Sequence, residues 1–178
     1  MAGCGFDADV VARLHGKRHG GNISYWTWAM PLLESIRSYH YPDLHVYCES
    51  LVDGQAAKFD YPARWAFAIN LPCYAGGLLV APEANGTDGL LNVATFGKGS
   101  IWHALRYVGL VALGWHQVLS DYRTALVTRV RIESSEAVPY QLDGDPGGFL
   151  PLDIDVLPQR MTLMAPRKRL EELVEGTK

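Results

Sequence analysis

The chain has 178 residues, of which 48% are hydrophobic and 20% charged, as in one globular domain able to bury a sizeable core. Its formal charge of −3 gives no basic surface for nucleic acid, which argues against a nucleic-acid partner. Three widely spaced cysteines (Cys4, Cys48 and Cys73) indicate reduced thiols, and no apolar run reaches the roughly 18 residues of a membrane span, so we expect a cytoplasmic protein.

The beginning of the chain is abrupt. Met1 to Phe6 are mostly small and apolar, as at the end of a buried strand, and Asp7 stands where a helix would begin. A domain seldom starts in this way. We therefore expect a missing segment upstream of Met1, and the alternative is a short native N-terminus.

Hydrophobic periodicity predicts mostly strands with helices inserted between them. Helical spacing predicts a helix over 6–15 and a second helix through Ile36, capped by Asn22 or Ser24 and kinked or split at Pro31. A third helix is predicted over 101–119 with Ser100 as the cap. Alternating or short apolar runs predict strands from Leu44 to a hairpin turn at Asp53-Gly54, and over 63–71, 78–81, 90–96, 125–132, 138–142, 150–156 and 160–164. A short polar helix is expected over 167–175. Without a regular βαβ alternation, this order predicts a mainly β (α+β) fold, an antiparallel β-sandwich with helical insertions.

Two acidic turns are candidate sites. Asp88 precedes Gly89 in a polar turn that leads into a strand, where Asp-Gly is also ordinary hairpin chemistry. The functional interpretation is an oxygen-only cation site built from the Asp88 carboxylate and nearby main-chain carbonyls. Both interpretations remain open on the residues alone.

The second acidic turn contains Asp143-Gly144-Asp145 after a short strand. Residues two apart in a strand share a face, so both carboxylates are expected to point the same way and to act as a base or share a cation. The alternative is a solvated turn that leads to Pro146-Gly147-Gly148.

Other reactive or aromatic residues suggest no site. The six histidines are scattered, and Cys73 has no neighbouring base that would activate its thiol. Four tryptophans fall in helical patterns, which favours packing over a lipid surface; they are Trp26, Trp28, Trp102 and Trp115.

Six short motifs occur in a fixed order along the chain. They are Gly5-Phe6-Asp7-Ala8, Asn70-Leu71-Pro72-Cys73-Tyr74-Ala75-Gly76-Gly77, Ala81-Pro82-Glu83-Ala84, Thr87-Asp88-Gly89-Leu90-Leu91-Asn92-Val93, Gln141-Leu142-Asp143-Gly144-Asp145 and Met164-Ala165-Pro166. Together they resemble the C-terminal half of the diacylglycerol kinase family, which includes sphingosine kinases and bacterial soluble lipid kinases. The resemblance covers nearly the whole chain.

The resemblance implies a division of labour between two domains. Complete family members have an N-terminal domain whose Gly-Gly-Asp-Gly-Thr loop binds ATP, and this sequence contains no such loop. Residues 1–178 are therefore expected to form the single C-terminal β-sandwich domain, with the ATP-binding domain absent.

The resemblance also implies roles for individual residues. Asp145 stands where the family has the Glu of Asp-Gly-Glu, the proton acceptor from the lipid hydroxyl, with a side chain one methylene shorter. Asp143 would orient Asp145 or the metal network. Asp88 matches the acid of a structural cation turn, which the main-chain carbonyls of Asn85 and Leu90 would complete.

The implied reaction is transfer of the ATP γ-phosphoryl group to a primary lipid hydroxyl, with Mg²⁺ as cofactor, in phospholipid biosynthesis. The partners are a lipid substrate and ATP bound by the absent domain, and peripheral membrane contact and a homo-oligomer are compatible with this function. We expect the chain to be inactive alone. The alternatives are a non-catalytic lipid-binding or regulatory β-sandwich, and a structural or oligomeric β domain unrelated to kinases.

Overall fold

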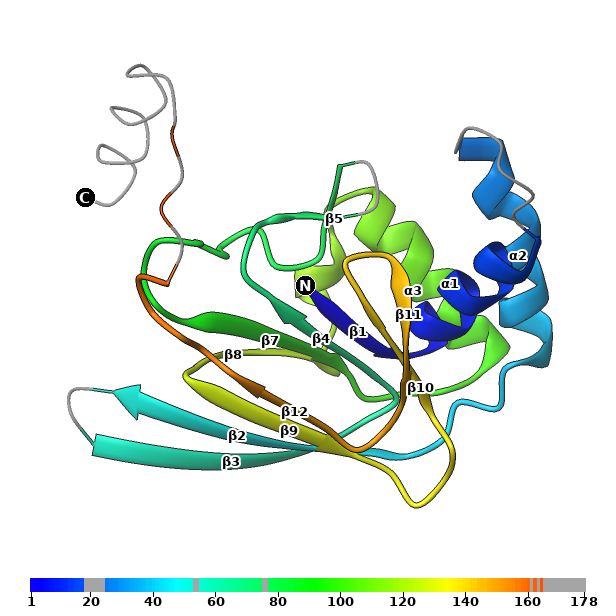
Figure 1. Ribbon diagram of the computed structural model, residues 1–178. Helices are drawn as coiled ribbons and strands as arrows, with labels where there is room; N and C mark the ends of the chain where they lie inside the picture. The colour runs from blue at the N-terminus through cyan, green and yellow to red at the C-terminus, as the bar shows by residue number, and fades with distance from the viewer. Residues whose placement is uncertain (18–24, 53–54, 75–76, 161, 163, 165–178) are drawn as a thin grey trace.

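The computed structural model describes residues 1–178 except for 18–24, 53–54, 75–76, 161, 163 and 165–178. A six-stranded sheet and a four-stranded sheet form two layers, and three helices lie beside the six-stranded sheet (Figure 1). All neighbouring strands pair antiparallel. The expected mainly β fold, an antiparallel sandwich with helical insertions, is confirmed.

The six-stranded sheet contains the strand at the beginning of the chain. Its order is β11 (Asp145–Phe149), β10 (Pro139–Leu142), β1 (Ala2–Gly5), β4 (Trp65–Ile69), β7 (Leu91–Phe96) and β8 (Tyr122–Val127). The small residues of β1 are fully buried between β10 and β4, as expected from their sequence.

The second sheet has the order β12 (Leu152–Asp155), β9 (Arg129–Glu133), β2 (Leu44–Val52) and β3 (Gln55–Ala63). A separate short ribbon pairs β5 (Cys73–Tyr74) with β6 (Leu78–Leu79). The expected hairpin turn at Asp53-Gly54 and the helix over 167–175 lie outside the described residues.

Three strand predictions need correction. Residues 125–132 form no single strand, because the chain leaves one sheet for the other at Thr128, whose amide donates to Glu49 O at 2.9 Å. Arg160, Thr162 and Met164, the described residues of the expected strand over 160–164, are not in a strand. Residues 145–149, where no strand was predicted, form β11.

Strand β4 shows how one sheet separates two cores. Its large residues Trp65, Phe67 and Ile69 face the helices, whereas Ala66 and Ala68 face the second sheet. Alternation along a strand produces this division. Small residues on the inner face allow the two sheets to approach closely.

The helices are α1 (Phe6–Lys17), α2 (Tyr25–Ser38) and α3 (Ile101–Ala112), and a 3₁₀ turn, η1 (His116–Val118), follows α3. Helix α2 continues through Pro31. The cap at Ser100 is confirmed, because its hydroxyl accepts from the His103 amide at 3.3 Å. Helix α3 ends at Ala112 and not at 119, since Gly114 has φ 72° and turns the chain away.

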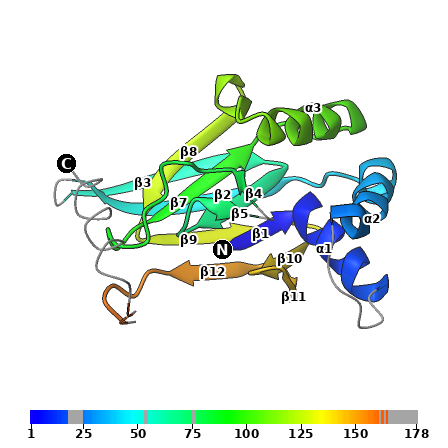
Figure 2. The same ribbon diagram turned by 90° about the horizontal axis from the view of Figure 1, so that it is seen from above.

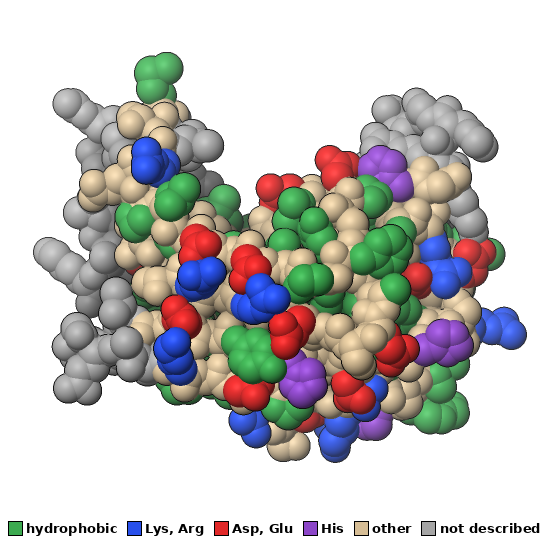
Figure 3. Space-filling view, turned by 60° about the horizontal axis from the view of Figure 1, so that its bottom comes forward, with side chains coloured by type: hydrophobic (Ala, Val, Ile, Leu, Met, Phe, Trp, Pro, Cys, Tyr) green, Lys and Arg blue, Asp and Glu red, His purple; other side chains and the backbone are tan. Residues whose placement is uncertain are grey.

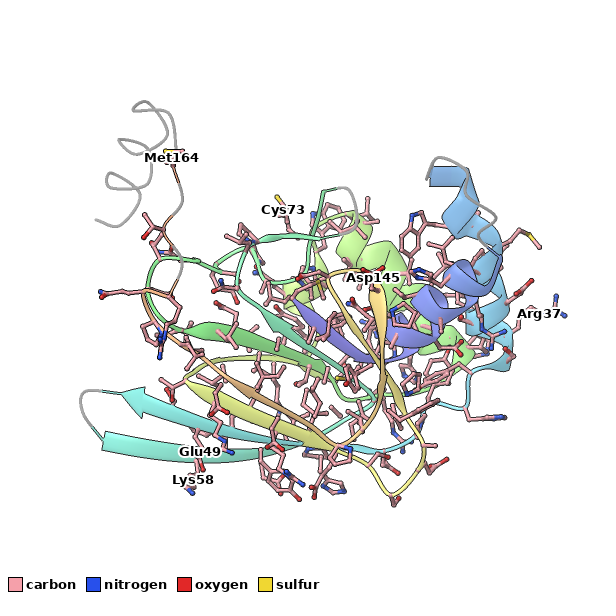
Figure 4. All side chains as sticks on the ribbon, in the orientation of Figure 1. Arg37, Glu49, Lys58, Cys73, Asp145 and Met164 are labelled. Atoms are coloured by element: carbon pink, nitrogen blue, oxygen red, sulfur yellow. The ribbon has the colours of Figure 1, made fainter. Side chains whose placement is uncertain are left out.

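The outer face of the four-stranded sheet carries a ladder of opposite charges (Figure 3). Arg131 Nη1 lies 2.6 Å from Asp153 Oδ2, and Lys58 Nζ lies 2.9 Å from Glu49 Oε1 (the latter pair is labelled in Figure 4). The hydrogen bond from Lys58 holds the pKa of the Glu49 carboxyl below its usual value. Such cross-strand pairs are ordinary sheet stabilisation and do not indicate a catalytic site.

Candidate active site

The Asp143-Gly144-Asp145 sequence forms the tight turn between β10 and β11. Asp143 and Gly144 both have left-handed backbones, with φ of 49° and 92°, a conformation that Asp and Gly adopt more readily than most residues. Leu142 pairs directly with Asp145 across the turn. The acids therefore do not belong to one extended strand, and the expectation that strand alternation gives them a common face is wrong.

The N-terminal residue fixes the first acid. The Asp143 amide donates to Met1 O at 2.9 Å, and the Asp143 carboxylate accepts from the Met1 ammonium group. Asp143 is thus engaged with the edge of β1. This contact positions the turn and leaves the second acid separate from it.

A buried network of hydrogen bonds connects the same turn to helix α1. Gln141 is fully buried, and its Nε2 donates to Asp7 Oδ2 at 2.9 Å, while its Oε1 accepts from the Gly144 amide at 2.7 Å. Asp7 lies in the first turn of α1, where the helix dipole stabilises a carboxylate. A Cβ atom at Gly3 would overlap Asp7 Oδ2, so this glycine leaves the space that the pair needs.

Asp145 is held by this support yet points outward. It lies at the start of β11, close to α1 (Figure 4), and its side chain is 79% exposed. His15 Nε2, near the end of α1, is 3.8 Å from Asp145 Oδ1. An exposed carboxylate on a fixed hairpin can accept a proton from a ligand that a second surface brings to it.

The Asp88 turn is closed by its own side chains. Asp88 Oδ1 accepts from the Leu90 amide at 2.8 Å, and Asn85 Oδ1 accepts from the Thr87 amide at 3.0 Å. The Asp88 side chain is exposed, and Gly89 has φ 75°. The oxygen-only donor set suits a hard cation such as Mg²⁺ or Ca²⁺. The described residues contain no group of three or more His, Cys, Asp or Glu placed to bind a metal, so such an ion would depend on main-chain oxygens.

The register of the sheet places the two acidic turns at one edge but far apart. Asp145, Leu142, Ala2, Ala68 and Val93 form one row across five strands. Four strand spacings put Val93, five residues after Asp88, about 19 Å from Asp145. The two turns are therefore separate candidate sites.

An aromatic cluster fills the space between the helices and the six-stranded sheet. Phe6 stacks on Trp65 with ring centroids 4.4 Å apart, and Trp65 meets Tyr107 edge to face at 5.4 Å. Burial, reinforced by the Asp9 charge, raises the pKa of Tyr41 to about 12, so its hydroxyl stays neutral. Four buried polar atoms in and around this cluster have no hydrogen-bond partner among the described residues; they are Ser35 Oγ, Tyr39 OH, Trp65 Nε1 and His116 Nδ1.

Helix α1 lies between the cluster and the acidic hairpin. Phe6 packs into the cluster and His15 faces Asp145. Nine residues of an α-helix make about two and a half turns, so these side chains project from opposite sides of α1. Asp145 is thus on the other side of the helix from the aromatic cluster.

Sequence reasoning located the acids but missed their support. The scattered histidines suggested no site, and neither Gln141 nor the Met1 terminus was a candidate, yet His15 lies beside Asp145. The one available signal was a polar Gln141 in a short strand that had to be buried on one face. His116 is buried in the core, with Nε2 2.9 Å from Val80 O.

Comparison with known proteins agrees with this architecture. The family model described as the YegS C-terminal NAD kinase beta sandwich-like domain matches residues 1–165. The chain belongs to this family of C-terminal β-sandwich domains, which are found in diacylglycerol kinase-like lipid kinases.

Individual relatives are longer than the chain. A diacylglycerol kinase of Mycobacterium tuberculosis (strain ATCC 25618 / H37Rv) is 32% identical over 98 residues, which cover 55% of the chain and 31% of that protein. A diacylglycerol kinase of Bacillus subtilis (strain 168) is 24% identical over 166 residues, or 93% of the chain and 51% of that protein. The matched regions thus span a third to a half of these relatives.

A solved structure supports the fold. A crystal structure described as a diacylglycerol kinase from Bacillus anthracis str. Sterne superimposes with a TM-score of 0.51 and 23% identity, covering 88% of the chain and 48% of that protein. Among the described helices, none has the length and apolar character needed to cross a membrane.

Proposed function

We propose that this chain is the acid-bearing half of an ATP-dependent lipid kinase and that Asp145 is its proton acceptor. The observation that supports this function best is the fixed hairpin from which the Asp145 carboxylate projects into solvent. ATP and Mg²⁺ would be bound by a nucleotide-binding domain outside residues 1–178. The relatives named diacylglycerol kinases are consistent with such a pairing, since they extend well beyond the matched region.

The proposed reaction is in-line transfer of the γ-phosphoryl group to a primary hydroxyl of the lipid. Asp145 takes the hydroxyl proton as the oxygen attacks phosphorus, and Mg²⁺ would neutralise the phosphate charge. Asp143 has a positioning role, because its backbone amide donates to Met1 O at 2.9 Å and so ties the turn to the beginning of β1. The acyl chains are proposed to lie along the apolar surface of the sandwich or between the two domains.

The Asp88 turn is proposed to be a structural cation site and not part of the reaction. The Asp88 carboxylate and the main-chain carbonyls of Asn85 and Leu90 would bind the ion. The strand that follows this turn, β7, is separated from β11 by three other strands of the sheet, which supports this separation.

A second candidate function is a non-catalytic lipid-binding or regulatory domain. The wide exposure of Asp145 favours it, because a carboxylate that is surrounded by water is a weak general base. For either function we infer a cytoplasmic protein with free thiols at Cys4, Cys48 and Cys73.

A domain-joining experiment separates these functions. The half of the Bacillus subtilis relative outside the match is fused upstream of Met1, and transfer of labelled phosphate from ATP to diacylglycerol is measured for the fusion and for the chain alone. We expect turnover by the fusion and none by the chain. A fusion that binds ATP without phosphorylating lipid would favour the non-catalytic function, and turnover by the chain alone would overturn the proposal.

A further inference from the structure

Helix α3 exposes an apolar face on the side opposite the core. Ala104 and Tyr107 are buried against the six-stranded sheet, whereas Trp102 is 77% exposed. Successive helical residues are about 100° apart, so Leu105, Gly109 and Leu113 share the side of Trp102. Seen from above, α3 lies along one border of the molecule (Figure 2).

The chain beyond the helix extends the same exposed surface. After the left-handed Gly114, Trp115 is 65% exposed and Val118 is also exposed. Between them, buried His116 binds Val80 O and packs edge to face on Tyr122 at 4.9 Å. We call this surface the α3 face; its large exposed residues are Ile101, Trp102, Leu105, Leu113, Trp115 and Val118. The interpretation of the tryptophans as packing residues is therefore wrong for Trp102 and Trp115.

Two exposed cations lie on or beside helix α3 in a protein that is acidic overall. The chain has 19 acidic residues, but none occurs in the sequence between Asp88 and Asp121. Exposed Lys98 and Arg106 fall in this interval, and neither forms an ion pair within the part of the chain that the structure describes. Asp121, the first acid after the helix, accepts a hydrogen bond from Tyr107 of α3.

We propose that the α3 face docks on the surface of an anionic lipid bilayer. Tryptophan and leucine insert at the boundary between headgroups and acyl chains, and neighbouring cations contact anionic headgroups. A second copy of the chain fits less well, because a two-fold contact would bring the exposed cations of one copy towards those of the other. This surface is independent of Asp145 and of any kinase activity.

Vesicle binding by the purified chain tests the proposal. Co-sedimentation is measured with phosphatidylcholine vesicles that contain or lack phosphatidylglycerol, together with the shift in tryptophan emission. We expect binding to the anionic vesicles. The double variant Trp102→Ser/Trp115→Ser should bind them at least about tenfold more weakly, because two large apolar side chains are lost. Arg106→Gln should lose about fivefold on anionic vesicles only.

Leu157→Ser is the matched control, since Leu157 is 64% exposed on another part of the surface and its replacement should leave binding unchanged. No binding of the wild-type chain to anionic vesicles would overturn the proposal, as would equal binding by the double tryptophan variant. Sedimentation velocity supplies the other decisive result: a dimer that Trp102→Ser dissociates would assign the face to a second copy.

Discussion

Replacing Gln141 with leucine should destabilise the fold and release the acidic hairpin. Gln141 is fully buried and bridges Asp7 and the Gly144 amide with hydrogen bonds of 2.9 and 2.7 Å. Leucine has a similar volume but offers neither a donor nor an acceptor. A bond to a charged acceptor contributes about 2 kcal/mol and a neutral one about 1 kcal/mol, so the loss is about 3 kcal/mol.

Urea unfolding followed by tryptophan fluorescence measures this loss, and the melting temperature should fall by about 9 °C for a chain of this size. Exchange of the Gly144 amide hydrogen, followed by NMR, should accelerate because its acceptor is removed. Gln117→Leu, the same change at an exposed position, is the control and should alter stability by less than about 0.5 kcal/mol. If Gln141→Leu is as stable as the control, or if Gly144 exchange is unchanged, the bridge does not hold the hairpin.

Three further results are expected. Gly3→Ala should lower the free energy of unfolding in urea by about 2 kcal/mol, since the new Cβ would overlap the Asp7 carboxylate. The control Gly109→Ala has open space around it and should leave this free energy unchanged or raise it by up to about 1 kcal/mol. Equal effects of the two substitutions would contradict the packing at Gly3. At pH 8 a thiol reagent should react with exposed Cys73 in the folded protein and with Cys4 and Cys48 only after unfolding, because these two thiols are buried. Burial raises the pKa of Cys48 to about 11. Three fast-reacting thiols in the folded protein would contradict this burial. Mg²⁺ or Ca²⁺ should raise the melting temperature of the wild type but not that of Asp88→Asn. The asparagine keeps an oxygen that can accept from the Leu90 amide but has no negative charge. An equal rise in both proteins would show that Asp88 does not bind the cation.

The layers of the fold were predictable from the sequence because two of their signals lie within short segments. One is the alternation of apolar and polar residues along a strand, and the other is a run of small apolar residues. The run from Leu44 alternates strictly, and the small residues of Ala2–Gly5 could only be buried. The change of sheet at Thr128 was not predictable, because an acceptor on a distant strand, Glu49 O, determines where the strand breaks. Strand β11 was missed for a similar reason: its Pro-Gly-Gly sequence resembles a turn, and pairing with β10 determines its conformation.

The candidate site was predictable only in part. The motif around Asp143 and Asp145 located the hairpin, but its support joins Gln141 to a residue 134 positions away, which no local pattern reports. Trp102 of the α3 face shows the same limit. Helical periodicity predicted its helix, while Ala104 and Tyr107 determine which side of the helix packs on the sheet.

Kinase activity of an Asp145→Asn variant tests the proposed role of this chain most directly. The substitution is made in the fusion with the half of the Bacillus subtilis relative that lies outside the match. Phosphoryl transfer to diacylglycerol is compared with that of Asp60→Asn, an equal change at an exposed position on the four-stranded sheet. Loss of the proton acceptor should lower kcat by about 10²-fold or more and leave ATP binding and the melting temperature unchanged. An Asp145→Asn fusion that turns over as fast as the Asp60→Asn fusion would show that Asp145 is not the proton acceptor.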